Sequence, residues 1–159
     1  MWLKEYGISS PEDVAYNFSK VIPLDNKYMV ILGGIKGAEF LPEKPEKGEF
    51  NIFVVDVLKN KVIFQKAIAD YRVYAACSKG EGSQIFMVGG QDPRTGLWTR
   101  DATYIENLAL EIKDQKKRPL VPKKLSEPLP MALIGPSMYH FIDPKGEVKI
   151  YVTGVDAQE

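Results

Sequence analysis

The chain has 159 residues, 45% of them hydrophobic and 26% charged, and its 21 basic side chains balance its 21 acidic ones. This composition predicts a single globular domain with a hydrophobic core, and the zero net charge argues against a general attraction to nucleic acid or to an anionic membrane surface. With Cys77 as its one cysteine, the chain has no intramolecular disulfide, and its apolar runs are too short to span a bilayer, so we expect a cytoplasmic protein.

The first predicted elements form a β-hairpin. The polar turn PLDNK at 23–27 is followed by YMVILGGI at 28–35, an apolar run that stops on Gly33 and Gly34. A strand, a tight turn and a second strand are the usual signal of a hairpin. Two further β-rich runs, split by the turn LKNK, follow in FNIFVVDVLKNKVIFQKA at 50–67. We therefore expect four strands in this part of the chain.

The same spacing occurs three times along the chain. Phe18 precedes Gly33 by 15 residues, and the same 15 residues separate two further pairs, Tyr74 with Gly89 and Tyr139 with Gly154. The polar turns KGEGS at 79–83 and PKGEV at 144–148 lie at corresponding places, and ATYIEN and LALEIK are predicted as later strands of the second copy.

The adjacent glycines Gly89 and Gly90 raise the question of a phosphate-binding loop. Such loops place backbone amides at a helix N-terminus, but the sequence here continues with Gln-Asp-Pro, without a GKS or GKT motif. We expect instead a strand end where glycine allows a positive φ or the close approach of a neighbouring layer.

These units resemble the kelch repeat of β-propellers, most closely in RVYAACSKGEGSQIFMVGG at 72–90. Tyr104 and Phe53 stand in the place of the family's later tyrosine. The chain departs from the family pattern at Val62 and Ile112, where a tryptophan is usual, and at Val155, which replaces the second glycine of the third copy.

The resemblance implies an all-β fold of four-stranded antiparallel blades within a single domain over 1–159. The repeats would span about 14–70, 71–127 and 128–159, which amounts to about two and a half blades of a partial propeller. Propellers close with four to eight blades, so three explanations stay open: a fragment of a longer chain, a part-propeller completed by another chain, or a different β fold such as a sandwich.

Candidate catalytic residues are few. The chain has one histidine, His140, which together with Cys77 is too little for a zinc site, and we expect a hydrogen-bonding histidine and an inert buried thiol. No spacing selects two carboxylates for glycoside hydrolysis. We therefore expect no catalytic residue, metal or cofactor. The alternative is a propeller enzyme that acts on a sugar or another small molecule at the central axis.

The strongest functional signal lies in long loops at 35–49, 91–101 and 112–130, which the blade pattern places on one face. Loops with arginine, tryptophan and clustered lysine favour a non-catalytic scaffold that binds an acidic surface of another protein. This other protein would complete the propeller or belong with the chain to a larger assembly. Nucleic acid is the less favoured partner, and a solvated basic loop is the alternative. The predicted partner-binding residues are Arg94, Trp98, Arg100, Lys116, Lys117, Arg118, Lys123 and Lys124.

Overall fold

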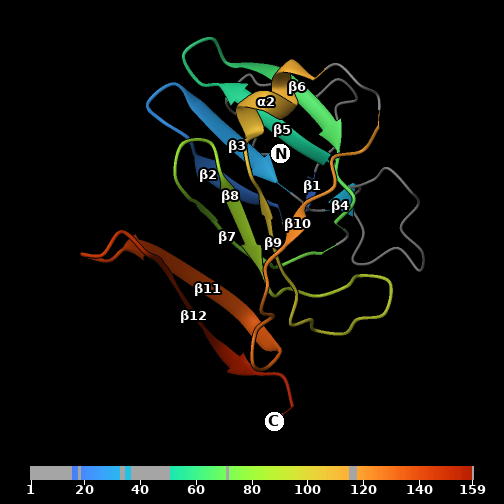
Figure 1. Ribbon diagram of the computed structural model, residues 1–159. Helices are drawn as coiled ribbons and strands as arrows, with labels where there is room; N and C mark the ends of the chain where they lie inside the picture. Colours follow the sequence, from blue (N-terminus) through green and yellow to red (C-terminus); the bar gives the residue numbers. More distant parts are fainter. Residues whose placement is uncertain are drawn as a thin grey trace.

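The computed structural model describes residues 16–17, 19–32, 35–36, 51–70, 72–114 and 118–158. Within these ranges the chain forms antiparallel sheets and a single short helix (Figure 1). The expected all-β fold is therefore confirmed, whereas the partial propeller of about two and a half blades stays a prediction. The predicted repeat residues Phe18, Gly33 and Gly34 lie outside the described ranges.

The first four-stranded sheet has the order β2-β3-β5-β6 and contains the strands predicted for this part of the chain. The Asp25 carboxylate closes the first turn by accepting hydrogen bonds from the backbone N–H groups of Lys27 and Tyr28, at 2.8 and 2.7 Å. All six residues of β5 are buried, as expected for an apolar strand in the middle of a sheet. The strands are β2 (Lys20–Pro23), β3 (Tyr28–Leu32), β5 (Asn51–Asp56) and β6 (Lys61–Ala67), and a separate pair joins β1 (Tyr16–Asn17) to β4 (Ile35–Lys36).

The second four-stranded sheet has the order β7-β8-β9-β10. Its first three strands follow the prediction, but its fourth strand lies within the segment predicted as a loop at 112–130. Prolines close to β10 restrict it to two residues, and lysines are well tolerated on a strand at the edge of a sheet. The strands are β7 (Ala76–Lys79), β8 (Ile85–Val88), β9 (Ala102–Ile105) and β10 (Lys123–Lys124).

The segment LALEIK was predicted as a strand, and this prediction is wrong. It forms the helix α2 (Leu108–Lys113), whose N-cap is Asn107. The Asn107 side chain accepts a hydrogen bond from the backbone N–H of Leu110, which satisfies a donor that the first turn of a helix would otherwise leave unpaired. Leu108 is fully buried, so the helix covers the core between the two four-stranded sheets with its first residue.

The third unit is the hairpin of β11 (Leu133–Ile142) and β12 (Val148–Asp156), with the predicted turn between them. Gly154 was expected to mark the end of a strand, but β12 continues past it. A Cβ atom at this position would lie 2.9 Å from the Leu133 Cβ atom, so the glycine allows β11 and β12 to approach closely. The predicted close approach was that of a neighbouring layer, whereas Gly154 lies against β11 of its own hairpin.

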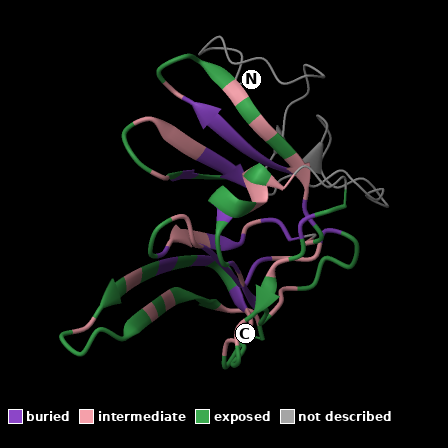
Figure 2. Ribbon diagram, turned by 45° about the horizontal axis from the view of Figure 1, so that its top comes forward, coloured by how far each residue is buried: buried purple, intermediate pink, exposed green. Residues whose placement is uncertain are grey.

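The three units stack face to face, and the first strand of the middle sheet, β7, lies beside both β2 and β11 (Figure 1). The first core, between the four-stranded sheets, includes Val30, Ile52, Ile85 and Leu108. The second core, between the middle sheet and the hairpin, includes Ala76, Phe86, Val88, Ala102 and Met138. A third cluster, formed by Ile31, Phe53 and Val55, lies on the other face of β3 and β5. Figure 2 shows the buried residues in purple.

Candidate functional site

Three described connections meet at one end of the stacked sheets. Because neighbouring strands are antiparallel, the tight turns lie at one end of the sheets, and the connections 68–75, 89–101 and 125–132 lie at the other, which we call the loop end. The predicted loop 91–101 and the part of the predicted loop 112–130 that follows β10 are thus brought together there. The predicted loop 35–49 falls almost entirely outside the described residues.

A cleft of about 280 Å³ opens at the loop end. Backbone hydrogen bonds hold the loop that borders it, from Asp92 N to Leu97 O and from Thr99 N to Gly90 O, both at 2.9 Å. The cleft has both polar and apolar walls, and its charged lining consists of Asp70, Asp92 and Asp101 with Arg72, Arg94 and Lys124.

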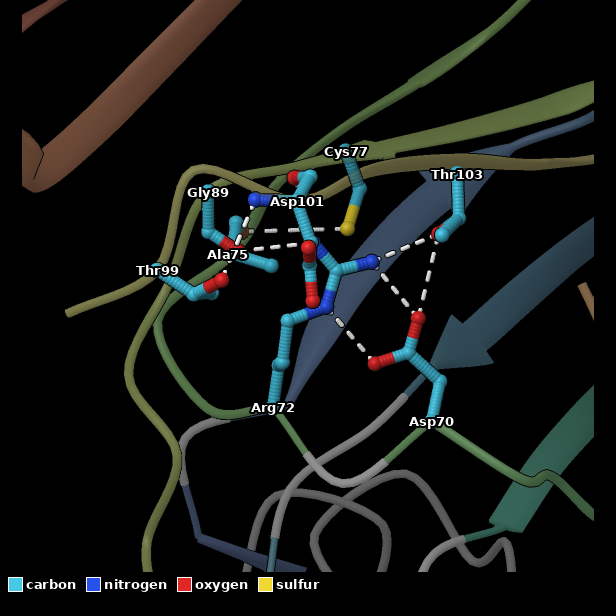
Figure 3. A network of polar contacts seen from close by, with 8 residues as sticks. All are labelled: Asp70, Arg72, Ala75, Cys77, Gly89, Thr99, Asp101 and Thr103. Carbon is cyan, nitrogen blue, oxygen red and sulfur yellow. Dashed lines mark hydrogen bonds and ion pairs between the residues drawn. The ribbon is translucent and has the colours of Figure 1, made fainter. Parts of the chain in front are cut away.

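Arg72 forms the floor of this cleft and is only 8% exposed. Its Nε and Nη2 atoms donate to the two carboxylate oxygens of Asp70, at 2.7 and 2.6 Å, and Nη2 also donates to the Thr103 hydroxyl. Nη1 donates to the carbonyl oxygens of Gly89 and Asp101, at 2.9 and 2.7 Å (Figure 3). Five contacts match the five N–H donors of a guanidinium, so Arg72 has none left for a ligand.

These contacts decide the charge of Arg72. Burial by itself opposes the charged form, but the hydrogen bonds and the negative charge of Asp70 outweigh it, so the pKa of Arg72 is raised. The guanidinium therefore stays charged, and it ties the connection before β7 to the end of β8 and the start of β9. Arg72 is a structural residue of the site.

Asp92 and Arg94 repeat this arrangement at the rim of the cleft. The Nε and Nη2 atoms of Arg94 donate to the two carboxylate oxygens of Asp92, at 3.0 and 2.6 Å. The hydrogen bond from the Arg94 side chain is the main reason that the pKa of Asp92 is lowered. Unlike Arg72, the Arg94 side chain is 51% exposed, so it faces solvent at the mouth of the cleft.

The predicted partner-binding residues divide into two groups. Arg94 and Lys124 line the cleft, and Trp98 lies close by, with its ring centroid 6.0 Å from that of Tyr74. Arg100 instead donates to the Leu129 carbonyl oxygen, and Lys123 pairs with Glu106. Neighbouring residues of a strand point to opposite faces, which separates Lys123 from Lys124. Arg118 is exposed, and Lys116 and Lys117 lie outside the described ranges.

Gly89 and Gly90 both have positive φ, at +65° and +98°. A Cβ atom at Gly90 would lie 2.7 Å from the Val73 carbonyl oxygen, and one at Gly89 would lie 3.3 Å from the Pro136 side chain of the hairpin. The predicted role in backbone conformation and layer packing is confirmed. The Gly89 N–H also donates to the Asp101 carbonyl oxygen, so it is not available to a phosphate.

The two described aromatic repeat positions, Tyr74 and Tyr139, lie in different environments. Tyr74 was expected in a strand, but it lies before β7 with a positive φ of 57°, where its ring can meet Trp98. Tyr139 lies in β11 as expected, but its side chain faces solvent and is 71% exposed. The 15-residue spacing therefore marks equivalent places along the chain, but not equivalent environments.

The sequence pattern did not identify Asp70, Arg72 and Thr103, which build the floor of the cleft. The available signal was the repetition of aspartate and arginine two residues apart, at 70 and 72 and again at 92 and 94. A contact between Ser78 and His140 was also missed. The Ser78 Oγ atom lies 2.6 Å from His140 Nδ1 and links β7 to β11.

The remaining candidate groups show little reactive chemistry. Cys77 was expected to be buried but is half-buried, and the desolvation of its thiol raises the pKa to about 12. A thiol with this pKa is neutral at pH 7, in line with the low reactivity that was predicted. Across the described ranges, three or more histidine, cysteine, aspartate or glutamate side chains are nowhere grouped to hold a metal ion, and no helix is long and apolar enough to cross a membrane. No protein-family model matches the chain, and no curated protein matches it either.

Proposed function

We propose that the chain is a non-catalytic protein-interaction module, and that its loop-end cleft receives an acidic segment of another protein. The observation that carries this proposal is the contrast between the floor and the rim of the cleft. Every donor of Arg72 on the floor is bonded within the protein, whereas Arg94 and Lys124 on the rim are exposed. A rigid floor with accessible cations above it suits recognition better than bond making.

The charge around the cleft supports an acidic partner. The segment 112–130, which has six basic and two acidic side chains in its sequence, contributes Lys124 to the lining of the cleft. On the rim, the Asp92 carboxylate is already paired with Arg94, and on the floor Asp70 and Asp101 both face the charge of Arg72. The three aspartates and three cations of the lining balance, so the positive charge that a partner can reach is that of the exposed side chains of Arg94 and Lys124. Trp98 adds an aromatic side chain of the kind enriched in interface hot spots.

The scaffold is proposed to be a kelch-like part-propeller of about two and a half blades. Two four-stranded antiparallel sheets with the same strand order, followed by a hairpin, support this architecture. The adjacency of β2, β7 and β11 supports it as well, because the first strands of successive propeller blades surround a common axis.

A charge-reversal experiment tests the binding proposal. The loop-end variant carries Arg94→Glu and Lys124→Glu at the rim of the cleft, and the control carries Lys59→Glu and Lys61→Glu at the opposite end of the sheets, where both lysines are also exposed. Affinity capture with quantitative mass spectrometry should identify a partner that is lost only with the loop-end variant. For the purified pair, we expect the charge reversal to raise the dissociation constant about tenfold, which corresponds to ~1.4 kcal/mol. We also expect binding of the unchanged chain to weaken as the salt concentration rises, because salt screens the charges.

Two results would count against this proposal. If the loop-end variant retains the partner, the cleft is not its binding site. If both variants lose the partner to the same extent, binding depends on overall charge and not on the cleft.

The alternative of a propeller enzyme is favoured by one observation, the contact between Ser78 and His140. A serine hydroxyl close to an imidazole is the start of a nucleophilic site, and both residues lie on the first strands, which would face the propeller axis. Hydrolysis of nitrophenyl esters and glycosides by the chain, abolished by Ser78→Ala, would support this function. Retention of partner binding by the same variant would show that the two functions are separate.

A further inference from the structure

The hairpin β11–β12 has one buried and one exposed face. Side chains of the buried face, among them Met138 and Val152, pack into the second core. The other face exposes Tyr139, Phe141 and Tyr151 by 71, 48 and 55%, and the rings of Phe141 and Tyr151 stack with their centroids 5.3 Å apart. Figure 2 shows the hairpin largely in green and pink. An exposed aromatic face of this kind marks an interaction surface.

The outer edge of the same hairpin, along β12, has no partner strand in the described part of the chain. The second strands of the two larger sheets, β3 and β8, are each paired on both sides, whereas β12 is paired only with β11 in the described part of the chain. β12 has nine residues and no proline, so its backbone can pair along its whole length. A long, apolar and uncovered edge readily accepts a further strand.

The middle sheet shows where the additional strand would lie. In the first core, Val54 of the third strand β5 and Ile105 of the third strand β9 belong to one cluster and are 1 and 3% exposed. In the second core, Tyr104 of β9 stays half-buried. A third strand beside β12 would lie over β9 and cover Tyr104.

We propose that β12 accepts an antiparallel β-strand from a second polypeptide, and that further strands of the same polypeptide pack over the aromatic face of the hairpin. The strand would be apolar at alternate positions, because one side of it faces Tyr104 and the other continues the face formed by Tyr151 and Val155. This surface is separate from the loop-end cleft, so either proposal can fail without the other.

A second copy of this chain satisfies only part of these requirements. If two β12 edges paired about a two-fold axis perpendicular to the sheet, both aromatic faces would stay exposed on the same side. If two aromatic faces packed together, both β12 edges would stay unpaired. A different chain that contributes a strand with further strands attached covers the edge and the face together.

Site-specific photo-cross-linking tests the identity and geometry of the occupant. The photoreactive amino acid p-benzoylphenylalanine replaces Tyr151 or Val155 in the full chain, and replaces Leu58 as a control of matched exposure, 72% against 55 and 64%. In the cells that produce the protein, we expect Tyr151 and Val155 to form adducts with one strand of another polypeptide, at sites an even number of residues apart. Leu58 should not form this adduct.

The other outcomes overturn the proposal. An adduct between two copies shows a self-association surface, an adduct within one polypeptide shows an internal contact, an adduct with a helix excludes strand addition, and the lack of any adduct shows that the surface is unoccupied.

A substitution and an exchange measurement complete the test. Tyr151→Glu should weaken the isolated complex at least tenfold without loss of folding, since the side chain is exposed, whereas Leu58→Glu should leave binding unchanged. Backbone amides of β12 that point away from β11 should exchange rapidly in the chain alone and slowly in the complex. Fast exchange of these amides in the complex would exclude backbone pairing even if the two chains bind.

Discussion

At the scale of single residues, the protein places the same ion pair in two environments. Asp70 with Arg72 and Asp92 with Arg94 are both two residues apart, and both make the same two-pronged contact, with Nη2 2.6 Å from the carboxylate. The first pair is buried and fixes three segments of the chain, whereas the second lies at the rim of the cleft. The two ion pairs differ in burial because other chain segments pack around the first pair and leave the second exposed to solvent.

This contrast predicts different effects of the same substitution. Arg72→Met should lower the free energy of unfolding by about 3–5 kcal/mol, because it leaves the charge of Asp70 buried without a partner. Arg94→Met should lower it by at most about 1 kcal/mol, because exposed pairs contribute little. Urea unfolding followed by circular dichroism measures both values. Similar losses in the two variants would show that the buried network is not a structural centre.

Gly90 and Gly96 form a second matched pair, since both have positive φ. A Cβ atom at Gly96 would meet nothing within 4 Å, so Gly96→Ala should cost only the strain of left-handed backbone, about 1–2 kcal/mol. Gly90→Ala adds an overlap with the Val73 carbonyl oxygen, and we expect its unfolding free energy to fall by at least about 1 kcal/mol more. Equal unfolding midpoints for the two variants would contradict the close approach.

Cys77 provides a test that depends on pH. Burial raises the pKa of its thiol from 9.0 to about 12, so in the folded protein the thiol stays neutral at pH 9. In the unfolded chain the thiol ionises near pH 9, which favours the unfolded state. The contribution of Cys77 to the free energy of unfolding therefore falls as the pH rises above 9. We expect iodoacetamide to modify Cys77 at pH 9 only in urea, as measured by intact mass. Rapid modification without urea would indicate an accessible, reactive thiol.

At the scale of elements, α2 shows how burial selects the structure of a short segment. Its sequence is rich in good helix formers, and Asn107 caps its first turn. Ser83 supports the cap by donating from its hydroxyl to the Asn107 side chain, 3.0 Å away. The helix thereby connects the turn between β7 and β8 to the first core.

Two leucines of this helix test the role of its buried side. Leu108→Ala should reduce the unfolding free energy by about 2–5 kcal/mol, because it leaves a cavity in the first core. Leu110→Ala, at a position that is 61% exposed, should change it by less than about 0.5 kcal/mol. Both values come from denaturant unfolding. If Leu110→Ala is the more harmful change, the helix does not pack on the core as described.

At the scale of the whole molecule, the first core holds its two layers together more firmly than the second core does. The first core has fully buried residues from both four-stranded sheets and from α2. The second core contains several half-buried side chains, and the hairpin it anchors has an exposed outer face. The hairpin should therefore open more easily than the two sheets above it.

Native-state hydrogen exchange measures this difference. We expect peptides that cover β11 and β12 to exchange through a partial opening at low denaturant, while β5 and β8 exchange only through global unfolding. A partner bound to β12 would remove the difference. If all four strands exchange with one common free energy in the chain alone, the hairpin is not a separate unit of stability.

The sequence by itself determined the class of the fold and the positions of its hairpins. Alternating apolar runs and polar turns are local signals, and the turn at Asp25 closes through hydrogen bonds between residues at most three positions apart. Gly89 and Gly90, at the end of β8, were also predicted to allow a positive φ and close packing. These features do not depend on what packs against them.

Only the tertiary structure decided the features that depend on distant residues. LALEIK forms a helix because Leu108 reaches a core built from two sheets, and Lys123 and Lys124 form a strand because β9 offers them an edge. The cleft combines residues from separate connections, and its buried and exposed ion pairs have the same spacing in the sequence. Burial arises from all the layers together, so local pattern alone did not distinguish the structural arginine from the accessible one.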